Sequence, residues 1–179
     1  MDDQRLRFEQ MVAPHLGAAY NLARWLTRND HDAQDIVQDA ALRALRFIDG
    51  LRGDNARPWL LGIVRNATWT WLQANRPAEV SSQEDVGEPQ LPAPARDEPE
   101  NAAIRRADAR LLNEAIAALP PALREVIVLR EMEDLAYRQI AEIAGVPIGT
   151  VMSRLSRARR LLTQSVKAIE AAADRQGVR

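Results

Sequence analysis

The residues that could carry chemistry in this chain are charged side chains that recur at helical spacing. Asp32, Asp35 and Asp39 stand three and four positions apart, so a helix would present their carboxylates on one face. Such a row could hold a metal ion, but metal sites usually gather ligands from several elements. We therefore interpret the row as a surface that docks on a basic partner helix. The side chains beside the row are Gln38, Leu42 and Arg43.

A second candidate surface lies between residues 52 and 76, where arginines alternate with tryptophans and Asp54 is the only acid. Aromatic rings stack on bases and arginines pair with phosphates, which is typical of surfaces that bind single-stranded nucleic acid. The alternative is that the tryptophans belong to the core. We expect this of Trp59 and Trp71 and leave Trp69 open. The arginines of this stretch are Arg52, Arg57, Arg65 and Arg76.

The most specific pattern in the chain is a helix-turn-helix over about residues 137–162. The small side chain of Ala141 allows the second helix to approach closely, and Gly145 suits the turn conformation that a Cβ atom disfavours. Val151 would then pack the second helix back onto the first. This spacing predicts two helices that cross at a steep angle.

The second helix of this motif has the charge expected of a DNA recognition helix. After Glu142 no acid occurs until Glu170, so one face is basic. A helical hairpin with a solvated arginine-rich face is the alternative, and the charge asymmetry disfavours it. A recognition helix turns its N-terminal side chains to base edges and its flanks to phosphates. We assign the base edges to Thr150, Met152, Ser153 and Arg154, and the phosphates to Arg157, Arg159 and Arg160.

Catalytic chemistry is not predicted. His15 and His31 have no Ser, Cys or metal-ligand partner at a suitable spacing, and no glycine-rich phosphate loop occurs. The chain has no cysteine, which excludes disulfides and thiolate metal sites and fits a cytoplasmic protein. No run approaches the roughly 18 apolar residues that span a bilayer. We expect no cofactor, no metal, no membrane insertion and no enzymatic activity.

Composition predicts an all-α protein, because 46% of the residues are hydrophobic but only 4% are aromatic. A stretch rich in proline and acids has too few apolar residues to order itself and is typical of a linker. We predict two small helical domains, each with a modest core, joined by a flexible acidic Pro-rich linker. The predicted boundaries are 1–75 for the first domain, 76–103 for the linker, 104–173 for the second domain and 174–179 for a tail.

At least three helices are expected in the first domain and four in the second. Capping side chains at 29–32 separate the first two helices, and Pro58 suits the first position of a later one. Breaks in the second domain are expected at 120–121, 133–134 and 145–147. The expected apolar stripes in the first domain are Leu16, Ala19, Tyr20, Ala23 and Leu26, and then Ile36, Ala40, Arg43 and Phe47.

Several segments resemble the extracytoplasmic-function sigma factors of the sigma-70 family. Those similar to region 2 are DAQDIVQD at 32–39, LRA at 42–44, RPWL at 57–60 and RN at 65–66. Those similar to region 4 are LPP at 119–121, REVIVLR at 124–130 and IAEIAGVPIGTVMSRL at 140–155. The resemblance covers nearly the whole chain outside the linker and keeps the order of both domains.

The resemblance implies a factor that binds core RNA polymerase and directs promoter-specific initiation, by opening the minus-ten element and recognising the minus-thirty-five element. Its partners would be the clamp helices of the largest polymerase subunit, the flap, promoter DNA and an anti-sigma factor. The polymerase-binding residues would be Asp32, Asp35, Gln38, Asp39, Leu42 and Arg43. The minus-ten residues would be Arg52, Asn55, Arg57, Arg65, Asn66 and Trp69. The minus-thirty-five residues would be Thr150, Met152, Ser153, Arg154, Arg157 and Arg160.

Two other functions remain open at this point. A helix-turn-helix regulator would bind duplex DNA without docking on core polymerase. A sigma mimic would titrate an anti-sigma protein and never start transcription, although Arg65, Asn66 and the basic recognition helix argue against it.

Overall fold

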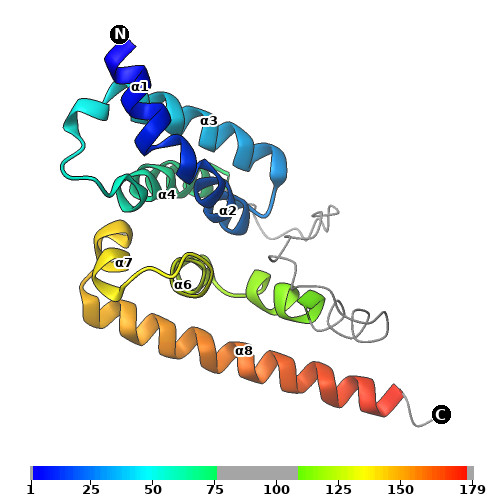
Figure 1. Ribbon diagram of the computed structural model, residues 1–179. Coiled ribbons are helices and arrows are strands. Elements are labelled where there is room, and N and C mark those ends of the chain that lie inside the picture. Colours follow the sequence, from blue (N-terminus) through cyan, green and yellow to red (C-terminus); the bar gives the residue numbers. More distant parts are fainter. Residues whose placement is uncertain (1, 76–108, 177–179) are drawn as a thin grey trace, which may run out of the picture.

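A computed structural model of the chain describes residues 2–75 and 109–176, and all regular structure in these two ranges is helical (Figure 1). The predicted linker, 76–103, lies outside the described residues. We refer to residues 2–75 as the N-terminal domain and to residues 109–176 as the C-terminal domain. The all-α prediction is confirmed for the described part of the chain.

The N-terminal domain is built from α2, α3 and α4, which pack against one another, with α1 crossing beside them (Figure 1). Short 3₁₀ turns, η1 and η2, precede α2 and follow α3. The bounds are α1 Asp2–Met11, η1 Ala13–His15, α2 Leu16–Thr27, α3 Asp30–Arg46, η2 Ile48–Gly50 and α4 Ala56–Ala74.

Local sequence signals explain the start of α3. Arg28 ends α2 in the left-handed conformation at φ 58°, and Asn29 then caps α3 by accepting a hydrogen bond from the Asp32 amide at 3.0 Å. The predicted capping segment is therefore confirmed. Helix α4 begins at Ala56, so Pro58 is not its first residue as predicted. Pro58 still lies in the first turn, where backbone N–H groups have no partner within the helix.

The buried stripe of α3 differs from the predicted one near its end. Ala40 and Ala44 are fully buried, whereas Phe47 is 61% exposed. The helix ends at Arg46, so its period no longer positions the next residues, and Ile48 in η2 enters the core instead. Phe47 is left as a large apolar side chain on the surface.

The C-terminal domain contains four helical stretches separated by the predicted breaks. The first is helical over 109–117, and η3 continues α6 as a π-type turn. Gly145 ends α7 at φ 66° and donates its N–H to the Ala141 carbonyl, as the predicted helix-turn-helix requires. The other bounds are α6 Pro121–Ile127, η3 Val128–Met132, α7 Tyr137–Ala144 and α8 Ile148–Gln176.

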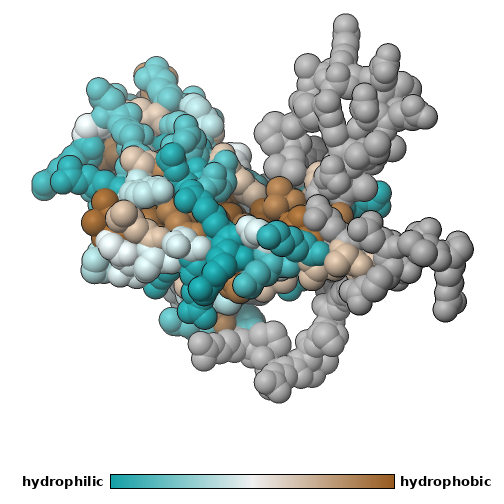
Figure 2. Space-filling model, turned by 90° about the horizontal axis from the view of Figure 1, so that it is seen from below, coloured by the Kyte–Doolittle hydropathy of each residue, from teal (hydrophilic) through white to brown (hydrophobic). Residues whose placement is uncertain are grey.

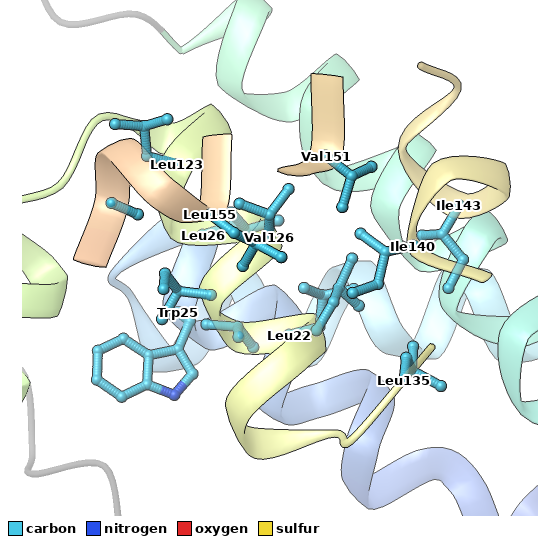
Figure 3. Packing of buried hydrophobic residues seen from close by; sticks show 14 of the residues in the cluster. Leu22, Trp25, Leu26, Leu123, Val126, Leu135, Ile140, Ile143, Val151 and Leu155 are labelled. Atoms are coloured by element: carbon cyan, nitrogen blue, oxygen red, sulfur yellow. The ribbon is translucent and has the colours of Figure 1, made fainter. Parts of the chain in front are cut away.

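One hydrophobic cluster contains residues of both domains. Leu22, Trp25 and Leu26 of α2 pack in the same cluster as Val126 of α6 and Ile140 of α7 (Figure 3). A second cluster lies entirely within the N-terminal domain. Helix α2 therefore buries two faces, one in its own domain and one against the C-terminal domain.

Arg124 joins the two domains through backbone carbonyls. Its guanidinium donates to the carbonyl of Trp25 in α2 at 2.9 Å and to those of Ala117 and Leu119, each at 2.7 Å. These carbonyls lie at the ends of helical stretches, where they lack helical partners and a positive charge is favourable. Burial, together with the positive charge of Arg28, lowers the pKa of Arg124 to about 10, so it stays charged at neutral pH.

Candidate nucleic-acid and protein interfaces

The carboxylate row predicted for α3 lies on its outer face. The side chains of Ala33, Ile36 and Ala40 hold the opposite face in the core. Asp35, whose side chain is 66% exposed, has an oxygen 3.7 Å from Nε2 of His31. Gln38, Asp39, Leu42 and Arg43 are exposed, and Asp32 is half-buried.

Two large apolar side chains are exposed in and directly after the last turns of α3. Leu42 is 58% exposed and Phe47 is 61% exposed. Apolar residues inside a charged rim are typical of surfaces that bind another protein. The structure thus brings the predicted polymerase-binding residues together on one open face.

The predicted minus-ten residues divide into two groups. Arg52 and Asn55 lie exposed in the turn before α4, and Asn66 is exposed on α4 itself. Arg57, Arg65 and Trp69 are half-buried and turn towards the C-terminal domain. Trp59 and Trp71 are partly buried against the N-terminal core, as predicted.

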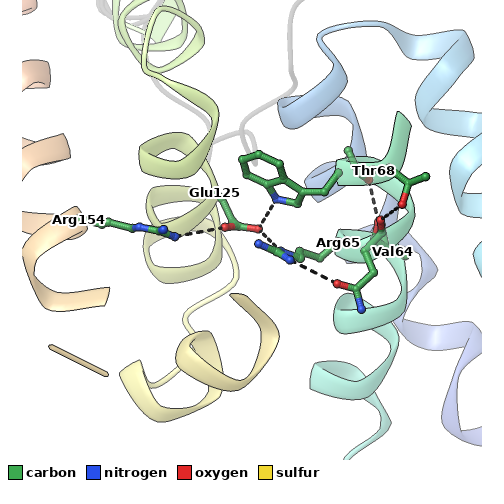
Figure 4. A network of polar contacts seen from close by, with 8 residues as sticks. Val64, Arg65, Thr68, Glu125 and Arg154 are labelled. Atoms are coloured by element: carbon green, nitrogen blue, oxygen red, sulfur yellow. Dashed lines mark hydrogen bonds and ion pairs between the residues drawn. The ribbon is translucent and has the colours of Figure 1, made fainter. Parts of the chain in front are cut away.

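Arg65 and Trp69 meet at one buried carboxylate, that of Glu125 in α6 (Figure 4). Arg65 Nε donates to Glu125 Oε1 at 2.7 Å, and Trp69 Nε1 donates to the same oxygen at 2.8 Å. The guanidinium carbon of Arg65 lies 5.2 Å from the centre of the Trp69 ring. Glu125 has 0% exposure.

A second interdomain ion pair joins Arg57 to Glu133, which follows η3 and is only 6% exposed. Asn21 of α2 donates to the other oxygen of Glu133 at 2.8 Å. Both contacts cross from the N-terminal to the C-terminal domain. Two buried acids of the C-terminal domain therefore hold arginines of the N-terminal domain.

The predicted recognition helix is the first part of α8. Val151, Leu155 and Ala158 form its buried stripe, while Met152 is 54% exposed. Viewed from the side of α8, hydrophilic residues run across the middle of the surface beside hydrophobic ones (Figure 2). The exposed residues on this part of α8 include Ser153, Arg157, Arg159 and Arg160, and Thr150 is half-buried.

Arg154 departs from this outward arrangement. Its side chain is 26% exposed and its Nη1 atom lies 3.9 Å from Oε2 of Glu125 (Figure 4). That oxygen accepts no hydrogen bond within the described part of the chain. By contrast, Arg159 points outward to Glu131 at 2.7 Å, and hydrogen bonds to Glu131 and Tyr137 raise its pKa.

Sequence reasoning missed Glu125 and Glu133 as functional candidates. A signal for Glu125 was present, because Arg124 and Glu125 interrupt the apolar run from Leu123 to Leu129. Charged residues are rarely buried unless they are paired, so a charge inside a buried helix requires a partner. The sequence did not indicate which partner.

No group of three or more His, Cys, Asp or Glu residues in 2–75 and 109–176 could hold a metal ion. Among the helices that are described, none has the length and apolar character needed to cross a bilayer.

Known families match both domains. Residues 11–77 match the family described as "Sigma-70 region 2", and residues 109–162 match "Sigma-70, region 4". The first segment contains α3 and α4, and the second contains the helix-turn-helix. The two matches follow the order that the resemblance predicted.

Relatives that match most of the chain are sigma factors as well. The chain is 36% identical over 155 residues to the ECF RNA polymerase sigma-E factor of Haemophilus influenzae, covering 82% of this chain and 79% of the relative. It is 34% identical over 142 residues to the ECF RNA polymerase sigma-E factor of Escherichia coli, and the match covers 76% of this chain and 74% of the relative.

Solved structures are similar over most of the chain. The sigma factor RpoE in complex with the anti-sigma factor NepR from Bartonella quintana has a TM-score of 0.68 at 27% identity, covering 89% of this chain and 96% of that one. CnrH in complex with the cytosolic domain of CnrY has a TM-score of 0.62 at 25% sequence identity, and the match covers 90% of this chain and 88% of that one. Since the family models, the relatives and the fold agree, the chain belongs to the extracytoplasmic-function sigma factors of the sigma-70 family, which direct transcription initiation.

Proposed function

We propose that this sigma factor docks on the clamp helices of the largest RNA polymerase subunit through the outer face of α3. The observation that carries this assignment is that Asp35, Asp39 and the apolar side chain of Leu42, which is 58% exposed, are all open to solvent on α3. A basic partner helix would find both charge complementarity and an apolar contact there. The residues assigned to docking are Asp32, Asp35, Gln38, Asp39, Leu42 and Arg43.

The minus-ten element is assigned to the turn before α4 and to the helix itself. Arg52, Asn55 and Asn66 are exposed and can reach DNA directly. Arg57, Arg65 and Trp69 would join them once they leave their partners in the C-terminal domain. Capture of an unstacked base by such groups offsets the unpairing cost of a few kcal/mol, so recognition and opening become one event.

The minus-thirty-five element is assigned to the N-terminal part of α8. The buried stripe of this helix supports the assignment, because it leaves Met152, Ser153 and Arg157 on the outside. The full set consists of Thr150, Met152, Ser153, Arg154, Arg157 and Arg160. In this role the chain binds and positions DNA and catalyses no reaction of its own.

An anti-sigma factor is proposed as the regulating partner. Both structural neighbours described above were solved with a protein partner, and the Bartonella quintana complex is with an anti-sigma factor. The chain would then act in the cytoplasm, where polymerase and promoter DNA are found. A helix-turn-helix regulator that works without polymerase is not favoured, since region 2 is matched as well as region 4.

The test is transcription in vitro from a pool of randomised promoters, with purified core RNA polymerase in the presence and absence of the protein. We expect transcripts that require the protein and share two upstream elements. An Arg52→Ala, Asn66→Ala variant should lose transcripts while still binding core polymerase. Absence of dependent transcripts with active core and folded protein would contradict the proposal.

A further inference from the structure

We infer that the exposed side chains of Ile148 and Met152 contact the methyl group of a thymine in the DNA that α8 recognises. The inference rests on the proposed function of α8 in binding the minus-thirty-five element. It adds the base that this part of the helix prefers, and it adds Ile148 to the residues that read the element.

Two large apolar side chains lie one turn apart at the start of α8. Ile148, the first residue of the helix, is 50% exposed, and Met152 is 54% exposed. Residues four positions apart are neighbours on one face of a helix. Packing does not explain the pair, because the buried stripe of this part of α8 consists of Val151, Leu155 and Ala158. The start of the recognition helix therefore carries an apolar pair that is open to solvent.

The surroundings of this apolar pair are polar, and the nearest acids in the sequence lie well outside it. Thr150 and Ser153 stand beside the pair in the sequence, and Arg157 is exposed one turn beyond Ser153. No acid occurs between Glu142 and Glu170. Such a segment attracts phosphates, whereas the centre of an interface with another protein is usually larger, more apolar and poor in charge. These surroundings favour DNA over a protein as the partner of the pair.

Thymine is the base that an apolar side chain can recognise in the major groove. Its C5 methyl group is apolar, while the other groups that distinguish the bases there are hydrogen-bond donors and acceptors. The N-terminal side chains of a recognition helix are the ones that reach base edges. Ile148 has no hydrogen-bonding side chain, and the thioether of Met152 is only a weak acceptor. Both can therefore read a base by burying its methyl group.

Gly149 allows the start of α8 to come close to the bases. It is exposed, and a Cβ atom at this position would meet no atom within 4 Å. Packing within the described part of the chain therefore does not require glycine here. Glycine is a poor helix former, but it lets the backbone approach a ligand closely. Its lack of a side chain helps Ile148 and Met152 to reach into the groove.

The test compares two pools of randomised duplex DNA that differ by one methyl group at each thymine. One pool contains thymine, and the other contains uracil, which lacks the C5 methyl group. Each pool is bound to the protein with and without core RNA polymerase, and the enriched sequences are determined. We expect thymine to be enriched at one or more positions of the upstream element. The same positions should lose this preference in the uracil pool.

Variants of the apolar pair connect the methyl group to the side chains. In the unchanged protein, uracil at a selected position should weaken binding about fourfold, which is the value of one buried carbon group. Met152→Ala should remove the difference between thymine and uracil, and Ile148→Ala should reduce it. Met152→Leu keeps an apolar side chain of similar volume and should retain the difference. Circular dichroism checks that each variant keeps its helix content.

The matched control is Leu6→Ala, which truncates a similarly exposed apolar side chain, 53% exposed, in α1. It should leave the difference between thymine and uracil unchanged. An equal loss of this difference in Leu6→Ala and Met152→Ala would overturn the inference, as would an upstream element that is the same in both pools. Weaker assembly of Met152→Ala with core polymerase, with the thymine preference intact, would assign the pair to a protein partner instead.

Failure of the proposed function gives a different result from failure of the inference. If transcription from the promoter pool fails while the protein alone selects thymine over uracil, the proposed function falls and the inference remains. If dependent transcripts appear but uracil changes nothing, the inference falls and the proposed function remains. No enrichment of any sequence from either pool would overturn both.

Discussion

At the scale of single residues, the surroundings of a carboxylate decide whether it can bind a partner or is already paired within the chain. Asp35 lies open on α3, where a partner can approach it, whereas Glu125 is fully buried among the side chains it restrains. An exposed charge mainly steers association, and a buried one must be paired where it lies. The two acids therefore call for different mutational tests.

Reversal of charge at Asp35 tests the docking face. Asp35→Arg should weaken binding to core polymerase on the order of tenfold, because the partner surface is proposed to be basic. The matched control is Glu114→Arg, which makes the same charge change at an exposed position in the C-terminal domain. Titration of labelled protein with core polymerase measures both. Equal affinity of the Asp35 and Glu114 variants would remove α3 from the docking surface.

Arg154 tests base reading by the recognition helix. Arg154→Ala should cost roughly 1–3 kcal/mol of discrimination at one position of the upstream element. Arg160→Ala, at an exposed position of the same helix, should instead weaken binding to all sequences alike. Selection from randomised promoters with each variant separates the two roles. A uniform loss for Arg154→Ala would make it a phosphate contact.

At the scale of elements, turn chemistry sets how the helices of the C-terminal domain meet. Gly145 adopts φ 66°, and the chain then turns from α7 into α8. The amide of Val146 also donates to the Ala141 carbonyl at 3.1 Å, so the end of α7 is capped by its own backbone. The position of the recognition helix depends on this turn.

Substitution at Gly145 tests the turn. Gly145→Ala should lower the free energy of unfolding by about 1–2 kcal/mol, since a side chain in the left-handed region is strained even though the surrounding space is open. Gly149→Ala, in α8 with equally open space, should leave stability unchanged or slightly higher. Urea denaturation followed by circular dichroism gives both values. A similar loss for both variants would mean that backbone conformation is not the cause.

At the scale of the whole molecule, the interface between the domains resembles a protein core. One apolar cluster runs from α2 into α6, α7 and α8 (Figure 3). Hydrogen bonds of Asn21, Arg65 and Arg124 also join the two domains. Such an interface favours unfolding of the two domains as a single unit.

Arg124 provides the test at this scale. Arg124→Met should reduce the free energy of unfolding by roughly 3 kcal/mol, because several buried carbonyls lose their donor. Arg138→Met, at an exposed position of α7, should change it by less than about 0.5 kcal/mol. Denaturation followed by tryptophan fluorescence should show one transition in the unchanged protein. Two separate transitions there would contradict a shared core.

The sequence by itself determined the helical class, the breaks between helices and the outer face of α3. These features depend on neighbours only a few residues apart: the Asn29 cap, the Gly145 turn and the spacing of Asp35 and Asp39. The helical spacing wrongly predicted that Phe47 is buried, because α3 ends at Arg46 and its spacing does not position the residues that follow. Family resemblance supplied the roles of the residues, which spacing alone left open.

Only the tertiary structure decided the partners of the buried charges and the second buried face of α2. Arg65 and Glu125 lie 60 positions apart, and Arg57 and Glu133 lie 76 apart. No local pattern encodes which of many arginines a buried carboxylate will meet, since that depends on how two finished domains pack. The same packing turns Arg65, Trp69 and Arg154 inward, although their types and positions predicted contact with DNA.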